Sequence, residues 1–241
     1  PVVFERLVPG DYLCIFASYR DGSESVPKEK FQVKLYSSLG PNPRFARMFI
    51  LEKGLDIERV HIDILTAENR QPDFADKNIL GTTPVLELDN GFMLSEIMAI
   101  AEYLEETHPE PVLIGSTAQE RAEVRMWTRR IDLEIAVPMT LGFRGGVGRP
   151  MFEPRMDVVG AEGAADLSRM SDNKWKWLDA QLEGKDYICQ DKFTMADLIA
   201  YCFIQFGYTI GWSLPEGTDN LAKFVDRIGQ RPSSKVWQDS E

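Results

Sequence analysis

The stretch Gly81-Thr82-Thr83-Pro84-Val85-Leu86-Glu87-Leu88 is followed directly by Asp89-Asn90-Gly91-Phe92-Met93-Leu94. An apolar run that begins at a proline, passes through an Asp-Asn-Gly turn and returns predicts a β-hairpin. Because proline cannot donate to a ladder, it belongs at the first strand residue or on an edge strand. A proline at such a bend is also a candidate for a cis peptide bond.

A cis bond between Thr83 and Pro84 would turn the backbone N–H and C=O of Thr83 outward. Such groups need hydrogen-bond partners, and an extended peptide lying alongside would supply them. The next residues, Ser95-Glu96, open a helix and place a carboxylate at its positively polarised end. Together these features can hold a zwitterionic peptide by its charged ends. The alternative is an ordinary hairpin capped by a helix.

The residues before the hairpin predict a βαβ unit. Alternating apolar residues predict one strand over Phe31–Tyr36 and another over Ile57–Ile64. Between them, Asn42 is a good N-cap, Pro43 a good first helical residue and Gly54 a usual C-terminal glycine. Such a unit is parallel and right-handed. With a short polar helix from Asn69 and a helix over Ser95–Thr107, the order becomes β-α-β-α-β-β-α.

The second half of the chain shows only helical patterns. A linker around His108-Pro109-Glu110-Pro111 precedes it. The expected segments are a helix over Ala118–Leu141, a flexible break over Gly142–Gly148, helices over Glu162–Leu182 and from Thr194 onward, and closing helices over Leu221–Ile228 and Ser233–Trp237. Thr194 and Asp197 form a capping-box pattern before a very apolar helix, which should be buried.

The expected domains follow from these patterns. An extension over residues 1–30, with a short strand or packed arm at Tyr12–Phe16, precedes an α/β domain over 31–108. A linker over 109–117 then leads to an all-helical domain over 118–241. The fold class is therefore α/β followed by all-α.

Composition excludes several classes of function. The 241 residues have a formal net charge of −11, which argues against binding of nucleic acid or of an anionic membrane surface. No apolar run reaches membrane-spanning length, and Glu5 and Asp11 argue against a signal peptide. The 3 cysteines are widely spaced, which favours reduced thiols in a cytoplasmic protein. With only 2 histidines and no cysteine pair at ligand spacing, no metal site is expected.

Three motifs together resemble the soluble glutathione transferases. They are the Gly81–Leu88 stretch, Ser95-Glu96 with Ala99-Ile100 and Tyr103-Leu104, and Phe193-Thr194-Met195-Ala196-Asp197. The resemblance covers about residues 31–240. It implies a thioredoxin-like N-terminal domain and an all-helical C-terminal domain, glutathione as co-substrate, a small apolar electrophile as second substrate, and a homodimer.

The resemblance also assigns the glutathione-binding residues. Thr83, between Thr82 and Pro84, would exchange backbone hydrogen bonds with the cysteinyl unit. Glu96 would meet the γ-glutamyl end, although the adjacent family serine is Ile97 here. Asn69 and Arg70 would meet the glycyl carboxylate, because guanidinium and carboxylate match bidentately. For Arg70 the alternative is a solvated surface charge.

The catalytic group departs from the common family pattern. Gly40 stands where most classes keep a catalytic tyrosine, serine or cysteine, and this resembles an atypical class from fungi and bacteria that relies on a helix end and a bound water. The helix expected to begin at Pro43 would point free N–H groups at the thiolate, and Asn42 could donate through its amide. Ser37 and Ser38 are further candidate donors, or simply polar loop residues.

The second substrate would lie between the two domains. Its expected wall consists of Met139, Thr140, Phe143 and Arg144, unless these residues only pack the domain boundary. Two other functions stay open: a binding or partner protein that keeps the fold without the chemistry, and a specialised glutathione-dependent dehalogenase or ether-cleaving enzyme. The missing hydroxyl groups at Gly40 and Ile97 motivate the first of them.

Overall fold

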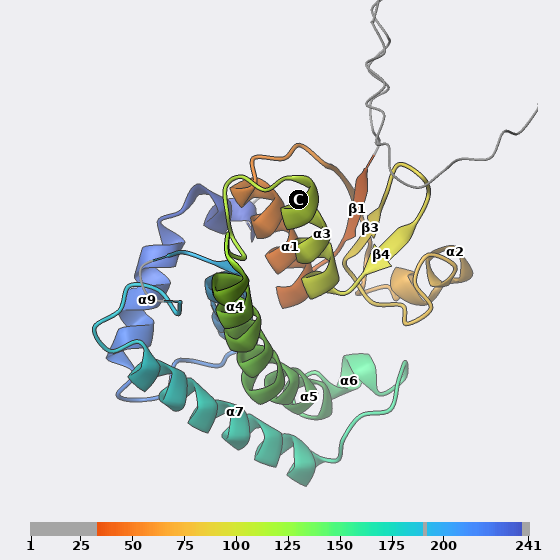
Figure 1. Ribbon diagram of the computed structural model, residues 1–241. Helices are drawn as coiled ribbons and strands as arrows, with labels where there is room; N and C mark the ends of the chain where they lie inside the picture. Colours follow the sequence, from red (N-terminus) through yellow and green to blue (C-terminus); the bar gives the residue numbers. More distant parts are fainter. Residues whose placement is uncertain (1–32, 190–191, 238–241) are drawn as a thin grey trace, which may run out of the picture. The chain divides into compact units, whose positions relative to one another are not determined.

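A computed structural model describes residues 33–189 and 192–237, with side chains described as far as residue 235 (Figure 1). The expected N-terminal extension, including the strand or arm at Tyr12–Phe16, lies outside these residues. The compact unit described below runs from Gln32 onward. Within the described part of the chain, no helix is long and apolar enough to cross a membrane.

The described residues form a four-stranded sheet in the order β2-β1-β3-β4. The strands are β1 (Lys34–Ser37), β2 (Glu58–His61), β3 (Val85–Glu87) and β4 (Met93–Ser95). β1 pairs parallel to β2, with Tyr36 opposite Val60, and antiparallel to β3, with Tyr36 opposite Val85. β3 and β4 form the hairpin, whose turn contains Gly91 at φ +79°. The βαβ unit and the hairpin expected from the sequence are both present.

Short helices complete this first half: α1 (Pro41–Glu52), the 3-10 turn η1 (Glu68–Arg70), α2 (Pro72–Ala75) and α3 (Ile97–Thr107). The expected start of α1 is wrong, because the helix begins at Pro41 with Gly40 as N-cap, two residues before the predicted Asn42. Gly40 has φ +123°, a conformation that glycine tolerates and other residues avoid. α3 likewise begins after Glu96, whose φ is +72°, rather than at Ser95, which belongs to β4.

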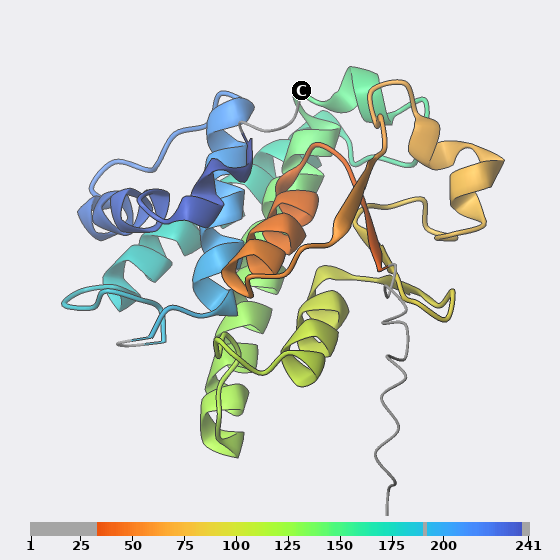
Figure 2. The ribbon, with the colours of Figure 1, turned by 90° about the horizontal axis from the view of Figure 1, so that it is seen from above.

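In the described residues of the second half, the regular elements are all helices or helical turns, apart from an isolated bridge between Cys189 and Lys192. The elements are α4 (Ala118–Ile131), the π-helical turn η2 (Asp132–Ala136), α5 (Val137–Gly145), α6 (Arg149–Phe152), α7 (Ala161–Gln181), α8 (Met195–Thr209), α9 (Asp219–Gly229) and the 3-10 turn η3 (Pro232–Trp237). The turned view in Figure 2 shows α1 running beside the helices of this half.

The expected flexible break over Gly142–Gly148 begins too early. α5 continues to Gly145, and its glycines serve close packing against the neighbouring helix. A Cβ on Gly142 would lie 2.6 Å from Ser168 Oγ, and one on Gly145 would lie 2.5 Å from Val159 Cγ2. Neither position has room for a side chain, so these glycines bring α5 and α7 together rather than interrupt the helix.

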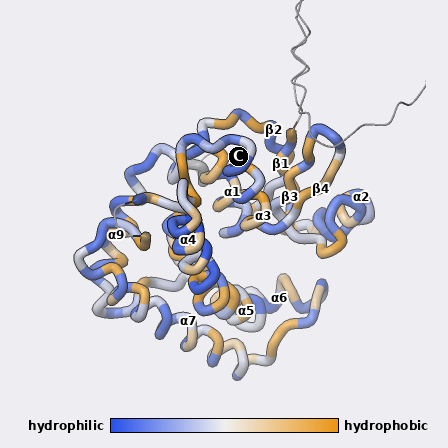
Figure 3. Tube along the Cα trace, in the orientation of Figure 1, coloured by the Kyte–Doolittle hydropathy of each residue, from blue (hydrophilic) through white to orange (hydrophobic). Residues whose placement is uncertain are grey.

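α1 joins the two halves in one core. It packs against α3 on one side and α8 on the other, and eight consecutive residues, Pro43 to Ile50, are buried. The apolar colouring of Figure 3 gathers around β1, β3 and this helix. Phe45, Phe49 and Trp175 are among the largest fully buried side chains and belong to the same cluster. The two halves therefore share one hydrophobic core through α1.

The predicted capping box at α8 is confirmed. Asp197 is fully buried and accepts hydrogen bonds from Thr194 N at 2.8 Å and Ile188 N at 2.8 Å. Burial raises the pKa of Asp197 to about 7, against the effect of these donors. The box therefore ties the loop before α8 to the first turn of the most deeply buried helix.

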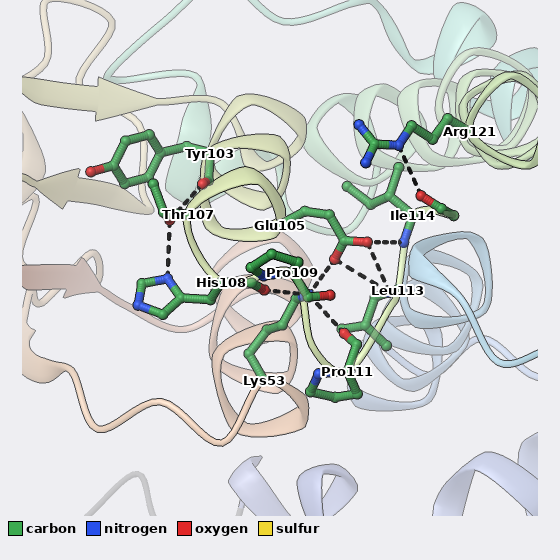
Figure 4. Close-up of polar contacts among 11 residues, drawn as sticks. Lys53, Tyr103, Glu105, Thr107, His108, Pro109, Pro111, Leu113, Ile114 and Arg121 are labelled. Carbon is green, nitrogen blue, oxygen red and sulfur yellow. Dashed lines mark hydrogen bonds and ion pairs between the residues drawn. The ribbon is translucent and has the colours of Figure 1, made fainter. Parts of the chain in front are cut away.

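The linker is fastened by a buried ion pair between Lys53 and Glu105 (Figure 4). Their side chains are 0% and 5% exposed. Lys53 Nζ also donates to the carbonyl oxygens of His108, Pro109 and Pro111, at 2.9, 3.3 and 2.7 Å. Glu105 accepts from Leu113 N at 3.1 Å and Ile114 N at 2.8 Å. Every polar group of the pair thus has partners, as buried charges require. The sequence patterns gave no sign of it.

Candidate functional site

A cavity of about 330 Å³ lies between the α/β half and the helical half. One wall consists of the first turn of α1, the η1 turn and the Gly81–Thr83 loop. The opposite wall comes from α5, the α6 segment and the end of α8. Elements distant in sequence therefore meet at the stretch that the sequence analysis singled out.

Thr83 lies in the wall of this cavity, and the Thr83–Pro84 peptide bond is cis, as expected. Among the hydrogen bonds of the described residues, none uses the N–H or C=O of Thr83. Its hydroxyl lies 2.5 Å from that of Ser38, and either group can donate. Asn78 Nδ2 holds the preceding residue by bonds of 2.8 Å to Thr82 O and 2.9 Å to Thr82 Oγ1. The backbone donor and acceptor of Thr83 are open while the loop around them is fixed.

Asn69 and Arg70 lie beside this loop and line the cavity. Asn69 Nδ2 donates to Gly81 O at 2.6 Å, and Arg70 Nη1 donates to Leu80 O at 3.0 Å. Gly81 has φ +57°, and a Cβ there would lie 2.7 Å from Asn69 O. Only glycine permits this close approach. One guanidinium nitrogen of Arg70 holds the loop, and the rest of this exposed group remains able to meet an anion.

The first turn of α1 offers fewer donors than the sequence suggested. Gly40, Pro41, Asn42 and Pro43 all line the cavity. Prolines have no N–H, and Arg44 N is bonded to Gly40 O at 3.2 Å. Of the first four helical N–H positions, this leaves the Asn42 N–H without a partner in the described structure. The expectation of several free N–H groups from a helix starting at Pro43 is therefore wrong.

The two candidate serines are buried behind the wall. Ser37 is 2% and Ser38 is 4% exposed, and neither lines the cavity. Ser38 Oγ bonds Leu39 O at 3.0 Å as well as the hydroxyl of Thr83, whereas Ser37 Oγ has no partner among the described residues. Ser38 thus positions Thr83. A role for either serine at a thiolate stays a prediction.

The other residues assigned by the resemblance lie outside this cavity wall. Pro84 and Ile97 are buried, and Glu96 is exposed at the start of α3. Their contacts with a peptide stay predictions.

On the helical side, Thr140, Phe143 and Arg144 line the cavity, and their role as the wall for a second substrate stays a prediction. Met139 does not line this cavity. It is 5% exposed and lines a neighbouring cavity of about 370 Å³ between α5 and α7.

Further residues of the helical half line the cavity and were not expected from the sequence. They are Met151 and Phe152 of α6, Arg155 after it, and Thr209 of α8. Phe206 of α8, whose apolar side chain could be either wall or core from the sequence, also lines it. Arg155 reaches across to the first half and donates to Ile64 O at 2.6 Å and Leu65 O at 2.8 Å. No periodicity or spacing in the sequence signals such a contact, because its acceptors are backbone carbonyls far away in the chain.

Two family models match the chain. "Glutathione S-transferase, N-terminal domain" matches residues 31–106, and "Glutathione S-transferase, C-terminal domain" matches residues 159–232. Together they cover more than half of the sequence. The chain belongs to the glutathione S-transferase family. The resemblance and the fold class inferred from the sequence are confirmed.

Similar family members come from fungi, bacteria and plants. Glutathione S-transferase 2 of Saccharomyces cerevisiae is 29% identical over 212 residues, which are 86% of this chain and 90% of that protein. The crystal structure of Gtt2 from the same organism superposes with a TM-score of 0.78 at 29% identity, covering 84% of this chain and 98% of that one. A Gtt2-class transferase of Vibrio parahaemolyticus gives a TM-score of 0.71 at 26% identity, covering 84% and 96%.

Proposed function

We propose that this glutathione transferase binds glutathione along the Gly81–Thr83 loop, lowers the pKa of its thiol and directs the thiolate at a small electrophile. The observation that carries the proposal is the pair of open backbone groups of Thr83 in a cavity wall, beside the first turn of α1. A family structure with bound glutathione exists at 18% identity and supports the fold alone. A cytoplasmic location would suit this co-substrate and the free thiols of Cys189 and Cys202.

In this proposal the cysteinyl unit pairs with Thr83 and the glycyl carboxylate meets Arg70, while Glu96 receives the γ-glutamyl end. Thiolate stabilisation falls to Asn42, whose N–H is the open donor of the first turn and whose side-chain amide is exposed at the cavity. An ordinary thiol has a pKa of about 8.5, and a helix N-terminus lowers it to roughly 3.5–7.5. Since a single backbone N–H is available here, we expect the pKa of the glutathione thiol to be lowered only slightly.

A titration of bound glutathione tests this function. The ultraviolet absorbance of the thiolate should appear at a lower pH in the complex than in free glutathione. With glutathione saturating, kcat/KM for the electrophile should rise with pH through the same ionisation. Asn42→Ala removes the side-chain amide and keeps the backbone N–H, so the bound thiol pKa should move partway back. Tight binding with an unshifted pKa would instead favour the binding protein without chemistry. If calorimetry detects no binding of glutathione to the folded protein, the cavity is not a glutathione site.

We also propose a homodimer, built on an apolar stripe along α4, η2 and α5. Met126, Leu133, Val137 and Leu141 are 41%, 45%, 40% and 37% exposed. Their spacings of seven and four residues place them on one helical face. An apolar face of this length is unusual on a chain with 27% charged residues unless a partner covers it. A second copy would cover it with the same stripe, as two-fold interfaces do.

The double substitution Leu133→Lys, Val137→Lys should convert the dimer to a monomer in sedimentation analysis, because like charges would face each other across the two-fold axis. Ile79→Lys is the matched control, since Ile79 is 93% exposed and lies outside the stripe. A monomeric wild-type protein, or a double variant that stays dimeric, would contradict this interface.

A further inference from the structure

Arg144 is a half-buried cation without an ion-pair partner among the described residues. It lies in the last turn of α5 and lines the cavity from the helical side. Its guanidinium carbon lies 5.3 Å from the centroid of the Phe152 ring. Its Nε is buried without a hydrogen-bond partner among the described residues, and no ion pair of the described residues includes it. Burial, and then the nearby charge of Arg70, lower the pKa of Arg144.

The surroundings of Arg144 are positive, although the protein as a whole is acidic. Arg70 and Arg155 line the same cavity, and the described residues of its wall include no aspartate or glutamate. The chain has a formal net charge of −11, so this absence of carboxylates is a local feature. Partial burial of a cation whose Nε has no hydrogen-bond partner is costly, and an anionic ligand would compensate for that cost.

Glutathione does not account for all three arginines. Arg70 is on the loop side and would meet the glycyl carboxylate. Arg155 already donates to two backbone carbonyls of the first half. Arg144 stands on the opposite wall, next to the aromatic rings of Phe143 and Phe152, where the second substrate would lie. These rings suit a planar apolar body, and the guanidinium suits a carboxylate attached to it.

We propose that the second substrate is an aromatic electrophile that carries a carboxylate, and that Arg144 binds this carboxylate; the inference rests on the proposed transferase function. The thiolate sulfur of glutathione attacks the ring carbon that bears a halide leaving group. The C–S bond forms, the C–Cl bond breaks, and chloride departs with the electron pair. The thiol proton has already passed to solvent, so the step is balanced without an oxidant or reductant.

A pair of matched electrophiles tests this specificity. 4-Chloro-3-nitrobenzoate and 4-chloro-3-nitrobenzamide undergo the same substitution, and only the benzoate carries a charge opposite the leaving group. Because the carboxamide activates the ring more strongly than the carboxylate, each kcat/KM is divided by the uncatalysed rate constant of that electrophile with the glutathione thiolate. The wild-type protein should favour the benzoate in this normalised kcat/KM by about tenfold or more, the effect expected from hydrogen bonds to a charged group. In Arg144→Met the ratio of the two normalised values should fall close to one, mainly through the KM of the benzoate.

Arg149→Met is the control for charge. Arg149 is close to Arg144 in sequence but pairs with Glu153 at 2.6 Å and does not line the cavity, so its loss should leave the ratio unchanged. A ratio close to one for the wild-type protein would overturn the assignment. So would an Arg144→Met variant in which only the KM for glutathione rises, because Arg144 would then serve the glycyl carboxylate. No turnover of either electrophile would instead count against the transferase function itself.

Discussion

Replacing Lys53 by methionine should destabilise the protein by about 3–5 kcal/mol, because Glu105 would remain as a buried charge without its cation. The glutamate side chain is 5% exposed. It would keep the N–H donors of Leu113 and Ile114, but these are neutral and compensate only part of the lost ion pair. The carbonyls of His108, Pro109 and Pro111 would also lose the ammonium group that gathers them. Urea unfolding measures the change as a lower midpoint at similar slope.

The matched variant for this prediction is Lys53→Met, Glu105→Gln. The amide oxygen of glutamine can still accept from the linker N–H groups, and no charge is left buried. The double variant should therefore be more stable than Lys53→Met alone. If its loss of stability instead equals the sum of the losses in Lys53→Met and Glu105→Gln, the pair acts through packing and not through charge. Unfolding of Lys53→Met at the wild-type midpoint would contradict the role given to the ion pair.

The second large effect is expected from Gly81→Ala, which should raise the dissociation constant for glutathione by about tenfold or more. A Cβ at Gly81 would lie 2.7 Å from Asn69 O and 3.1 Å from Arg70 Nη1. The first of these atoms is backbone and cannot turn away, so the loop that presents Thr83 must shift. Calorimetry with glutathione measures the binding change directly.

Gly91→Ala separates this clash from simple backbone strain. Gly91 has φ +79°, comparable to the +57° of Gly81, but a Cβ there has no atom within 4 Å. Both variants should lose about 1–2 kcal/mol of stability from the left-handed backbone. Only Gly81→Ala should lose affinity for glutathione. If both variants bind glutathione with equal affinity, the Gly81–Thr83 loop is not part of the binding site.

Local patterns predicted the fold and one wall of the cavity. The turn at Asp89-Asn90-Gly91, the proline at the start of β3 and the Thr194/Asp197 box each depend on neighbours within a few residues, and each is present in the structure. Thr83 follows from the proline bend itself, whereas Asn69 and Arg70 were assigned by the resemblance; all three line the cavity.

The features that were missed depend on contacts between distant segments. Lys53 and Glu105 are ordinary helical residues in the sequence, and only packing of α1 against α3 buries them together. Gly142 and Gly145 read as a flexible break because nothing local shows that α7 lies against them. Arg155 meets carbonyls of residues 64 and 65, whose positions no side-chain pattern can indicate.

The alternation of Pro41, Asn42 and Pro43 has a consequence for spectroscopy. Because neither proline contributes an amide proton, the first three residues of α1 give a single backbone signal in a proton–nitrogen spectrum, that of Asn42. The next amide of the helix, that of Arg44, is already bonded to Gly40 O. If glutathione binds as proposed, the chemical shift of the Asn42 amide would report whether the nearby glutathione sulfur is a thiol or a thiolate.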